Sequence, residues 1–193
     1  MYDLFLQHFN QKVPLSAQDT EIIKTYLSPK KLRKRQYLLQ EGDVCRHIAF
    51  VTKGALRSYT IEENGTERIM QFAVEGWTIA DLYSFLTGEP ATHNIDALED
   101  TELVLISRAA HEELLLKLDK YETYMRLLVT GAYLALQKRF NATVSHSPEE
   151  QYTSFISRYP EIAGRVPQHM IASYLGLTPE TISRLRRKIA TRR

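Results

Sequence analysis

The stretch that decides the fold is Val166–Ile189, VPQHMIASYLGLTPETISRLRRKI, and Gly176 divides it into two short segments. In the first segment, apolar side chains recur with a helical period: Met170, Ile171, Tyr174 and Leu175. In the second, Thr178 suits a helix N-cap, Pro179 suits the first helical position, and Glu180 suits the positive end of the helix dipole. The apolar residues that follow are spaced by three and four: Ile182, Leu185 and Ile189. We therefore predict two short helices joined by a tight glycine turn.

Two helices joined in this way form the helix-turn-helix pattern, whose second helix enters the major groove of DNA. An ordinary helical hairpin with a hydrated basic face is the alternative. Charge favours DNA, because residues 151–193 hold eight basic and two acidic residues, a net charge of +6, while the whole chain carries +2 and residues 1–150 therefore −4. A basic end on an acidic body suits phosphate neutralisation by that end. The candidate DNA-contacting residues are Thr178, Pro179, Glu180, Thr181, Ser183, Arg184, Arg187 and Lys188.

The composition is that of an ordinary globular protein, with 193 residues, 44% of them hydrophobic and 25% charged. This length can bury one good core or two small ones. The N-terminus has an acid at Asp3 and no long apolar run, so we expect neither a signal peptide nor a membrane span. Cys45 is the sole cysteine, which excludes a disulfide or a cysteine-built zinc or iron–sulfur site within one chain. We expect a cytoplasmic protein.

Residues 1–27 have a helical pattern, with a capping signal in which Ser16 precedes Asp19 by three residues, and Ser28-Pro29 is expected to stop the helix. From residue 31 to 107 the pattern changes to short β segments cut by glycines. The expected strands are Gln36–Gln40, His47–Thr52, Ala55–Ile61, Thr66–Val74, Thr92–Leu98 and Leu103–Ser107, with a short helix at Ala80–Thr87. Asn64-Gly65 predicts a hairpin with a type I′ turn. We expect an antiparallel sandwich or barrel that could enclose a small ligand.

A helix is expected from Arg108 to about Leu118 and a longer one from Lys120 to about Ser145. Apolar residues recur along the second helix at spacings of three and four: Leu118, Tyr121, Met125, Leu128, Ala132, Leu136 and Phe140. Further apolar residues thicken this stripe, and such a helix needs two partners. We expect these to be the β domain and the same helix of a second subunit, which gives a homodimer. The alternative is a helix central to a monomer.

Ser147-Pro148, followed by two acids, predicts the start of another helix, which Tyr159-Pro160 closes. A short link, Glu161–Pro167, then leads into the two-helix stretch. We predict a hinge near His146–Pro148, between the long helix that ends at about Ser145 and the helix that starts after Ser147. We expect an α+β fold with three parts: residues 1–118 as the β domain with flanking helices, 119–146 as the dimerisation helix and hinge, and 147–193 as the DNA-binding domain.

Over nearly its whole length the chain resembles the Crp/Fnr family of transcription regulators, typified by the cyclic-AMP receptor protein. The resemblance rests on glycines at the turns of a β-roll (Gly42, Gly54 and Gly76), on the long helix, and on the motif IASYLGLTPETISR that ends at Arg184. It implies an antiparallel β-roll, a dimerisation helix and a C-terminal helix-turn-helix. It also implies double-stranded DNA and a second subunit as partners. We expect RNA polymerase as a further partner.

In the family motif a Glu and an Arg contact base edges, and these fall on Glu180 and Arg184. Glu accepts a hydrogen bond from the cytosine N4 amine, and Arg donates to guanine O6 and N7. Thr181 and Arg187 are expected to contact phosphates. Pro179 stands where many relatives have a polar or basic residue, so we expect a different half-site sequence.

The resemblance also implies a cyclic-nucleotide pocket, whose positions fall on Ala80, Asp81, Leu82, Thr92, His93, Leu136 and Gln137. Family members hold the ribose with a Glu and the phosphate with an Arg about ten residues later. Here the matching later stretch is Glu89–Asn94, no arginine lies between Arg68 and Arg108, and apolar Leu136 replaces one polar partner of the base. A phosphate buried without a cation is costly, so we expect no usual cyclic-AMP binding, although His93 could substitute in part. We expect no other cofactor.

Relatives usually add a β-hairpin wing after the second helix, whereas four residues follow Ile189 in this sequence, and we expect Arg192 and Arg193 to contact phosphates instead. A basic run is expected to be a hydrated edge that discourages strand pairing, with a second DNA or polymerase contact as the alternative: Lys30, Lys31, Arg33, Lys34 and Arg35. The six histidines show no metal-ligand spacing, and no nucleophile or phosphate-loop motif is present, so we do not expect an enzyme. The remaining alternative is a ligand-binding or protein-interaction module whose helical hairpin does not contact DNA.

Overall fold

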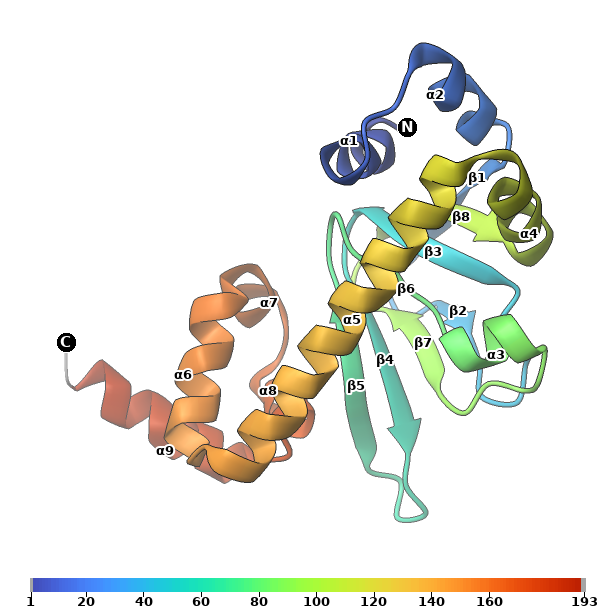
Figure 1. Cartoon of the computed structure of the whole chain (residues 1–193). Helices are drawn as coiled ribbons and strands as arrows, with labels where there is room; N and C mark the ends of the chain where they lie inside the picture. Colours follow the sequence, from blue (N-terminus) through green and yellow to red (C-terminus); the bar gives the residue numbers. More distant parts are fainter. Residues whose placement is uncertain (1, 192–193) are drawn as a thin grey trace.

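The computed structural model describes residues 2–191 and shows a β-roll, a long helix across it and a group of C-terminal helices (Figure 1). The strands are β1 (Leu27–Leu32), β2 (Tyr37–Leu39), β3 (His47–Lys53), β4 (Leu56–Ile61), β5 (Glu67–Ala73), β6 (Thr78–Ile79), β7 (Asn94–Ala97) and β8 (Thr101–Ser107). The helices are α1 (Asp3–Lys12), α2 (Ala17–Lys24), α3 (Leu82–Thr87), α4 (Arg108–Lys117), α5 (Asp119–Ser145), α6 (Pro148–Arg158), α7 (Pro160–Arg165), α8 (Gln168–Leu175) and α9 (Pro179–Ala190). Arg192 and Arg193, the expected phosphate contacts, lie outside the described residues.

The strands form two antiparallel sheets, one in the order β1-β8-β3-β6 and the other β2-β7-β4-β5, which confirms the predicted antiparallel roll. The core between them is continuous with the packing of α1, α4 and the start of α5 at one end of the roll. At that end the Phe9 ring stacks on Tyr124 with centroids 4.0 Å apart. His8 Nδ1 lies 2.9 Å from the Tyr124 hydroxyl, which gives this buried phenol a polar partner.

The expected helical region of residues 1–27 is confirmed up to Lys24, but the expectation that Ser28-Pro29 stops the helix is wrong. Two helices form, with the capping box of Ser16 and Asp19 starting α2, and the chain enters β1 at Leu27. Pro29 therefore lies inside a strand, which is possible because β1 is the edge of its sheet and Pro cannot donate a hydrogen bond there. Two lysines of the basic run, Lys30 and Lys31, belong to this edge strand, which comes before the first expected strand, Gln36–Gln40.

The hairpin between β4 and β5 is confirmed, but its turn is not type I′. The Gly65 N–H donates to the Glu62 carbonyl at 2.8 Å, and the Glu62 N–H donates to the Thr66 carbonyl at 2.9 Å. Among the described residues, Arg35 is the non-glycine residue with a positive φ, so Asn64 keeps an ordinary φ and Gly65 alone adopts the left-handed conformation here. The Asn64 side chain accepts from Thr66 N–H at 2.8 Å. The loop is thus a right-handed turn closed by a glycine, the usual solution for hairpins of this length.

The long helix α5 is buried at its start and exposed further on. Tyr121, Tyr124 and Met125 are at most 9% exposed. Seven apolar side chains further along α5 are 38% to 72% exposed: Leu127, Val129, Tyr133, Leu134, Leu136, Phe140 and Val144. Helices α1 and α4 at the end of the β-roll therefore cover the first part of the predicted stripe, and most of the rest is left uncovered. Within residues 2–191, no helix combines the length and the apolar content that crossing a membrane requires.

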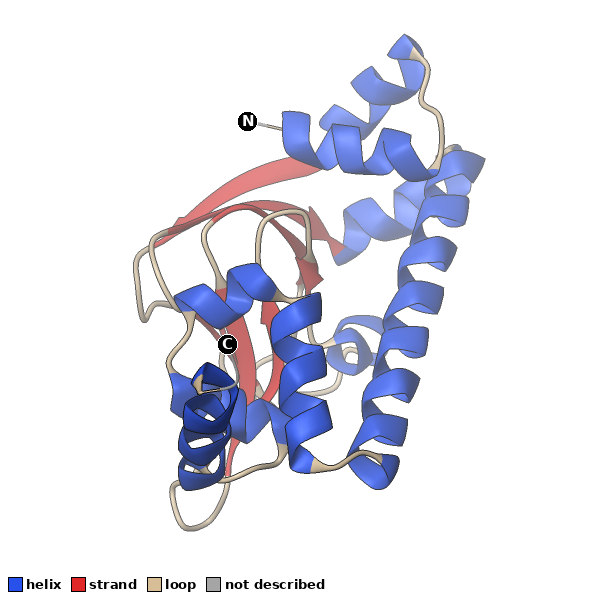
Figure 2. Ribbon diagram, turned by 90° about the vertical axis from the view of Figure 1, so that its left-hand side faces the viewer, coloured by secondary structure: helices blue, strands red, loops and turns tan. Residues whose placement is uncertain are grey.

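The C-terminal helices pack on the outer face of the β2-β7-β4-β5 sheet, in front of its strands in Figure 2. Helix α6 begins at the predicted Ser147 cap, where Ser147 and Glu150 form a capping box. The predicted link Glu161–Pro167 is mostly the helix α7, because Pro160 serves as its first residue and Ile162 is buried. That prediction of a link is wrong.

Candidate nucleic-acid interface

The turn between α8 and α9 has the geometry that the glycine predicts. Gly176 has a φ of 69°, and its N–H donates to the Ser173 carbonyl at 3.2 Å. The Leu177 N–H donates to the Ala172 carbonyl at 2.9 Å. These two bonds form a Schellman cap, which satisfies two carbonyls at the end of α8 and redirects the chain. An L side chain at this position would be strained by the positive φ.

Helix α9 begins as predicted from its first residues. The Thr178 hydroxyl oxygen accepts from the Thr181 N–H at 3.2 Å, and Pro179 occupies the first turn. Ile182 is fully buried, and Leu185 and Ile189 are half-buried against the same cluster. The apolar face of α9 is therefore fixed by packing, and its polar face is left in solvent.

The polar face of α9 carries the predicted DNA-contacting residues. Seven of the eight are exposed and Thr181 is half-buried. The Arg184 guanidinium lies 3.4 Å from the Thr181 hydroxyl, so two predicted contact residues adjoin each other. Lys188 makes an ion pair with Glu149 at the start of α6. Arg186, which is not among the predicted contacts, is also exposed. Burial raises the pKa of Tyr152 on α6, and the nearby charge of Arg186 offsets part of this rise.

The helix-turn-helix is docked on the β-roll through an unpredicted contact of α8 with β5. The Ser173 hydroxyl accepts from the Ile69 N–H at 2.9 Å and donates to the Glu67 carbonyl at 2.8 Å. Strand β5 is the edge of its sheet, so α8 covers backbone groups that would otherwise be unpaired. Beside this contact, Tyr174 packs on Phe72 with ring centroids 5.5 Å apart. Nothing in the sequence around Ser173 points to a partner so distant in the chain.

A second docking contact joins α7 to two loops of the roll. Arg165 donates to Glu75 at 2.7 Å and also pairs with Glu99. Burial of the Glu75 carboxyl acts to raise its pKa, but hydrogen bonds from Arg165 and from the Gly54 N–H outweigh this and leave the pKa below its ordinary value. Trp77 and Tyr159 pack edge to face with centroids 5.5 Å apart and close the contact.

The positions of the implied nucleotide pocket divide into two groups. Asp81 is 3% exposed, and its carboxylate accepts from the Ser84 N–H at 3.0 Å and from the Thr92 N–H at 3.1 Å. His93 Nδ1 lies 3.2 Å from the same carboxylate. The Asp81 carboxylate therefore occupies the backbone N–H donors that this loop would offer to a ligand.

The remaining pocket positions do not join that group. Leu82 is 39% exposed at the start of α3, and Ala80 lies half-buried next to Asp81. Leu136 is 54% exposed on α5, and Gln137 is exposed beside it. Among the described residues, no hydrogen bond links Leu136 or Gln137 to Asp81. The ligand role of these seven residues stays a prediction.

Comparison with known proteins places the chain in a family. Residues 29–117 match the cyclic nucleotide-binding domain family. The regulatory protein HlyX of Actinobacillus pleuropneumoniae is 31% identical over 81% of this chain and 69% of its own length. The fumarate and nitrate reduction regulatory protein of Vibrio cholerae is 28% identical over 90% of this chain and 74% of its own length.

Solved structures show the same fold. FixK2 of Bradyrhizobium japonicum superposes with a TM-score of 0.75 at 21% identity, over 86% of this chain and 85% of that one. The catabolite activator protein of Thermus thermophilus superposes with a TM-score of 0.58 at 18% identity, over 96% and 87% of the two chains. Together with the helix-turn-helix geometry, these likenesses confirm the family and the fold class predicted from the sequence. The chain belongs to the Crp/Fnr family of transcription regulators.

Proposed function

We propose that the protein binds duplex DNA sequence-specifically, as a homodimer, with α9 in the major groove. The observation that carries this proposal is the outer face of α9, where Glu180, Arg184 and Arg187 are exposed while Ile182 anchors the helix. Glu180 would accept from a cytosine N4 amine, and Arg184 would donate to a guanine O6/N7 pair. Thr181 and Arg187 would contact phosphates and set the position of the helix without specifying sequence.

The exposed half of α5 supports the homodimer. Leu136, Phe140 and Val144 are 54%, 67% and 72% exposed, and they follow one another at intervals of four residues. A second copy of α5 would cover this stripe in a short coiled coil. Two recognition helices related by a two-fold axis would then contact half-sites about 10 base pairs apart, or a multiple of that spacing. RNA polymerase stays a predicted partner.

We also propose that the protein does not bind cyclic AMP in the way the family's nucleotide motif implies. The support comes from the loop after α3, where no arginine lies between Arg68 and Arg108 and the Thr92 N–H already donates to the buried Asp81 carboxylate. A phosphate buried there without a cation would be costly. Calorimetric titration with cyclic AMP should therefore give no saturable heat. Saturable binding at one site per chain would overturn this part of the proposal.

The DNA-binding proposal is tested with two arginine variants of one helix. In Arg184→Ala we expect loss of about 1–3 kcal/mol of discrimination at one base position of the preferred site. Arg187→Ala should weaken binding to all sequences alike and reduce the salt dependence of the affinity by about one unit of slope. Fluorescence anisotropy on a set of singly substituted duplexes measures both quantities.

The matched control is Arg186→Ala, which removes the same charge from the same helix but on the side of Tyr152. It should preserve the base preference of the unaltered protein. An unchanged base preference in Arg184→Ala would contradict the assigned role of Arg184. Affinity that does not fall with salt would favour the alternative, an interaction module that does not bind DNA.

A further inference from the structure

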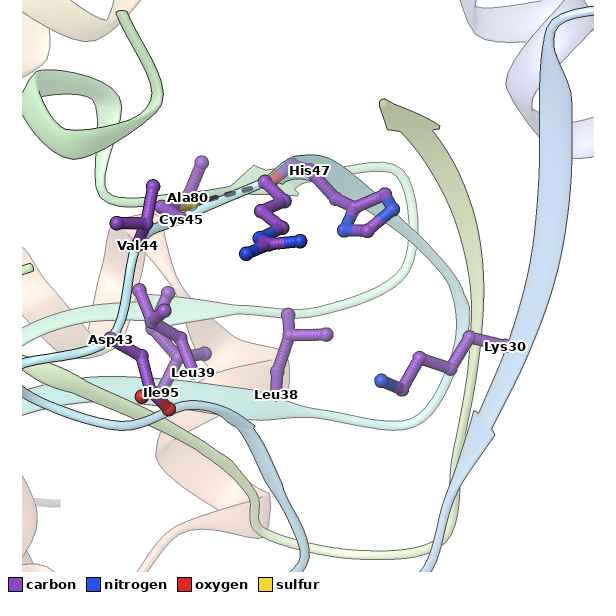
Figure 3. Close-up of a pocket in the computed structure, with 10 residues that line it drawn as sticks. Lys30, Leu38, Leu39, Asp43, Val44, Cys45, His47, Ala80 and Ile95 are labelled. Atoms are coloured by element: carbon purple, nitrogen blue, oxygen red, sulfur yellow. Dashed lines mark hydrogen bonds between the residues drawn. The ribbon is translucent and has the colours of Figure 1, made fainter. Parts of the chain in front are cut away.

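A pocket of about 270 Å³ is lined by residues of β1, β2 and β7 and by the segment that leads into β3 (Figure 3). Its floor is apolar and is formed by Leu38 and Leu39 of β2 and Ile95 of β7. Its rim comes from β1 and from the loop before β3. Of the residues in the implied nucleotide motif, Ala80 reaches this pocket, while Asp81, Thr92 and His93 do not line it. The pocket lies beside the loop that Asp81 closes, since the Cys45 N–H of its wall donates to Ser84 Oγ of α3 at 2.9 Å.

The rim gathers three basic groups from two places in the chain. Lys30 lies on β1, and Arg46 and His47 lie next to each other at the start of β3. Within the part of the chain that the structure describes, none of these three side chains has an ion-pair partner. The adjacent Lys31, by contrast, pairs with Glu102 at 2.8 Å. Unpaired cations beside an apolar floor indicate a site for an anion with an apolar body.

The charge balance of the rim sets the charge of that anion. Burial lowers the pKa of His47, and the charges of Lys30 and Arg46 lower it further, so this imidazole is mainly neutral at pH 7. Asp43 also lines the pocket, on the side away from Lys30 and His47 in Figure 3. Two cations and one carboxylate leave a net charge of +1, which suits a monoanion better than a phosphate dianion.

We propose that this pocket binds a small carboxylic acid whose carboxylate meets Arg46 and Lys30 and whose apolar body lies on Leu38, Leu39 and Ile95. A volume of 270 Å³ equals the liquid volume of about nine water molecules, so the ligand has roughly nine or ten non-hydrogen atoms. A guanidinium binds a carboxylate through two parallel N–H donors, which fixes the orientation of the ligand. This site goes beyond the proposed function and does not depend on DNA binding.

The test uses octanoate as the probe, because it carries one carboxylate on a straight apolar chain of the right size. Calorimetric titration of the full chain should show saturable binding of one octanoate per chain. Octylammonium, which has the same chain with the opposite charge, should not bind. A separate pH titration followed by NMR should show a higher His47 pKa with octanoate bound than without it, because the bound carboxylate offsets the two neighbouring cations.

Two rim variants and one control decide the site without disturbing the core. Arg46→Gln, at an exposed position, should weaken octanoate binding about tenfold, since it removes a charge-assisted hydrogen bond. Val44→Glu, at a rim position that is 38% exposed, should abolish binding by adding a second carboxylate. Arg33→Gln removes a nearby exposed cation that does not line the pocket and should bind octanoate normally. Absence of saturable binding, equal binding of octylammonium, or unchanged affinity in both rim variants would each overturn the proposal.

Discussion

Replacing Ser173 by alanine tests how the DNA-binding helices are held on the β-roll. The hydroxyl bridges two backbone groups of edge strand β5, accepting from Ile69 N–H at 2.9 Å and donating to the Glu67 carbonyl at 2.8 Å. Both bonds are part-buried, so each contributes about 1 kcal/mol to the docked arrangement. Their joint loss in Ser173→Ala amounts to about 2 kcal/mol, or roughly a thirtyfold shift of the docking equilibrium toward the open form.

The Ile69 amide proton reports directly on this contact, because the Ser173 hydroxyl that the variant removes is its hydrogen-bond acceptor. Native-state hydrogen exchange followed by NMR should show this proton exchanging roughly thirtyfold faster in Ser173→Ala. Amides in the central strand β8 should keep their protection, since the roll itself is not altered. Ser154→Ala, at an exposed position on α6, is the matched control and should leave the Ile69 exchange unchanged. Equal exchange of Ile69 in all three proteins would refute the docking contact as an energetic link.

Three further predictions concern a turn, an ion pair and the exposed half of α5. Gly54→Ala should lower the free energy of unfolding, measured by thermal unfolding, by about 1–3 kcal/mol, because φ is 95° and the new Cβ would lie 2.5 Å from Thr101 Oγ1. Gly42→Ala, where φ is 90° and the space is open, should lower it less. Equal losses in the two variants would contradict this prediction. The Glu75–Arg165 ion pair contributes its full stability above the ordinary Glu pKa of 4.5, and this stability is lost as the pH falls through the lowered pKa of Glu75 in the folded protein. Arg165→Gln should therefore raise the pKa of Glu75 in a carbon-13 NMR titration. An unchanged pKa would exclude the ion pair. Phe140→Asp should give a folded monomer in sedimentation equilibrium, because a side chain that is 67% exposed does not support the fold of one chain; a persisting dimer would place the interface elsewhere.

Local signals in the sequence predict the elements that local physics determines. The Ser16 capping box, the caps at Ser147 and Thr178 and the Gly176 turn each depend on atoms within a few residues, and each forms as expected. Strand β1 escapes prediction because it contains Ser, Pro and two Lys, a composition that is poor for a strand interior but acceptable at an edge paired with β8. Strand β1 forms because its backbone pairs with β8, and its own residues do not indicate this pairing.

The candidate sites show the same division. The exposed face of α9 follows from helical period alone, so its residues can be assigned from the sequence. Helical period cannot predict that the nucleotide loop is closed by a hydrogen bond from the Thr92 N–H to the Asp81 carboxylate, because the two residues are eleven positions apart and come together only in the fold. Docking through Ser173 joins residues 104 and 106 positions apart, and a single serine carries no pattern that encodes such a distance.

Selection from random duplex DNA tests the central claim most directly. The purified protein, without any added effector, would be incubated with a random pool, and the retained duplexes would be sequenced. The account predicts enrichment of an inverted repeat whose half-site centres lie about 10 base pairs apart or a multiple of that distance. Retention of DNA without any common sequence, or of a single unrepeated site, would contradict a two-fold sequence-specific regulator.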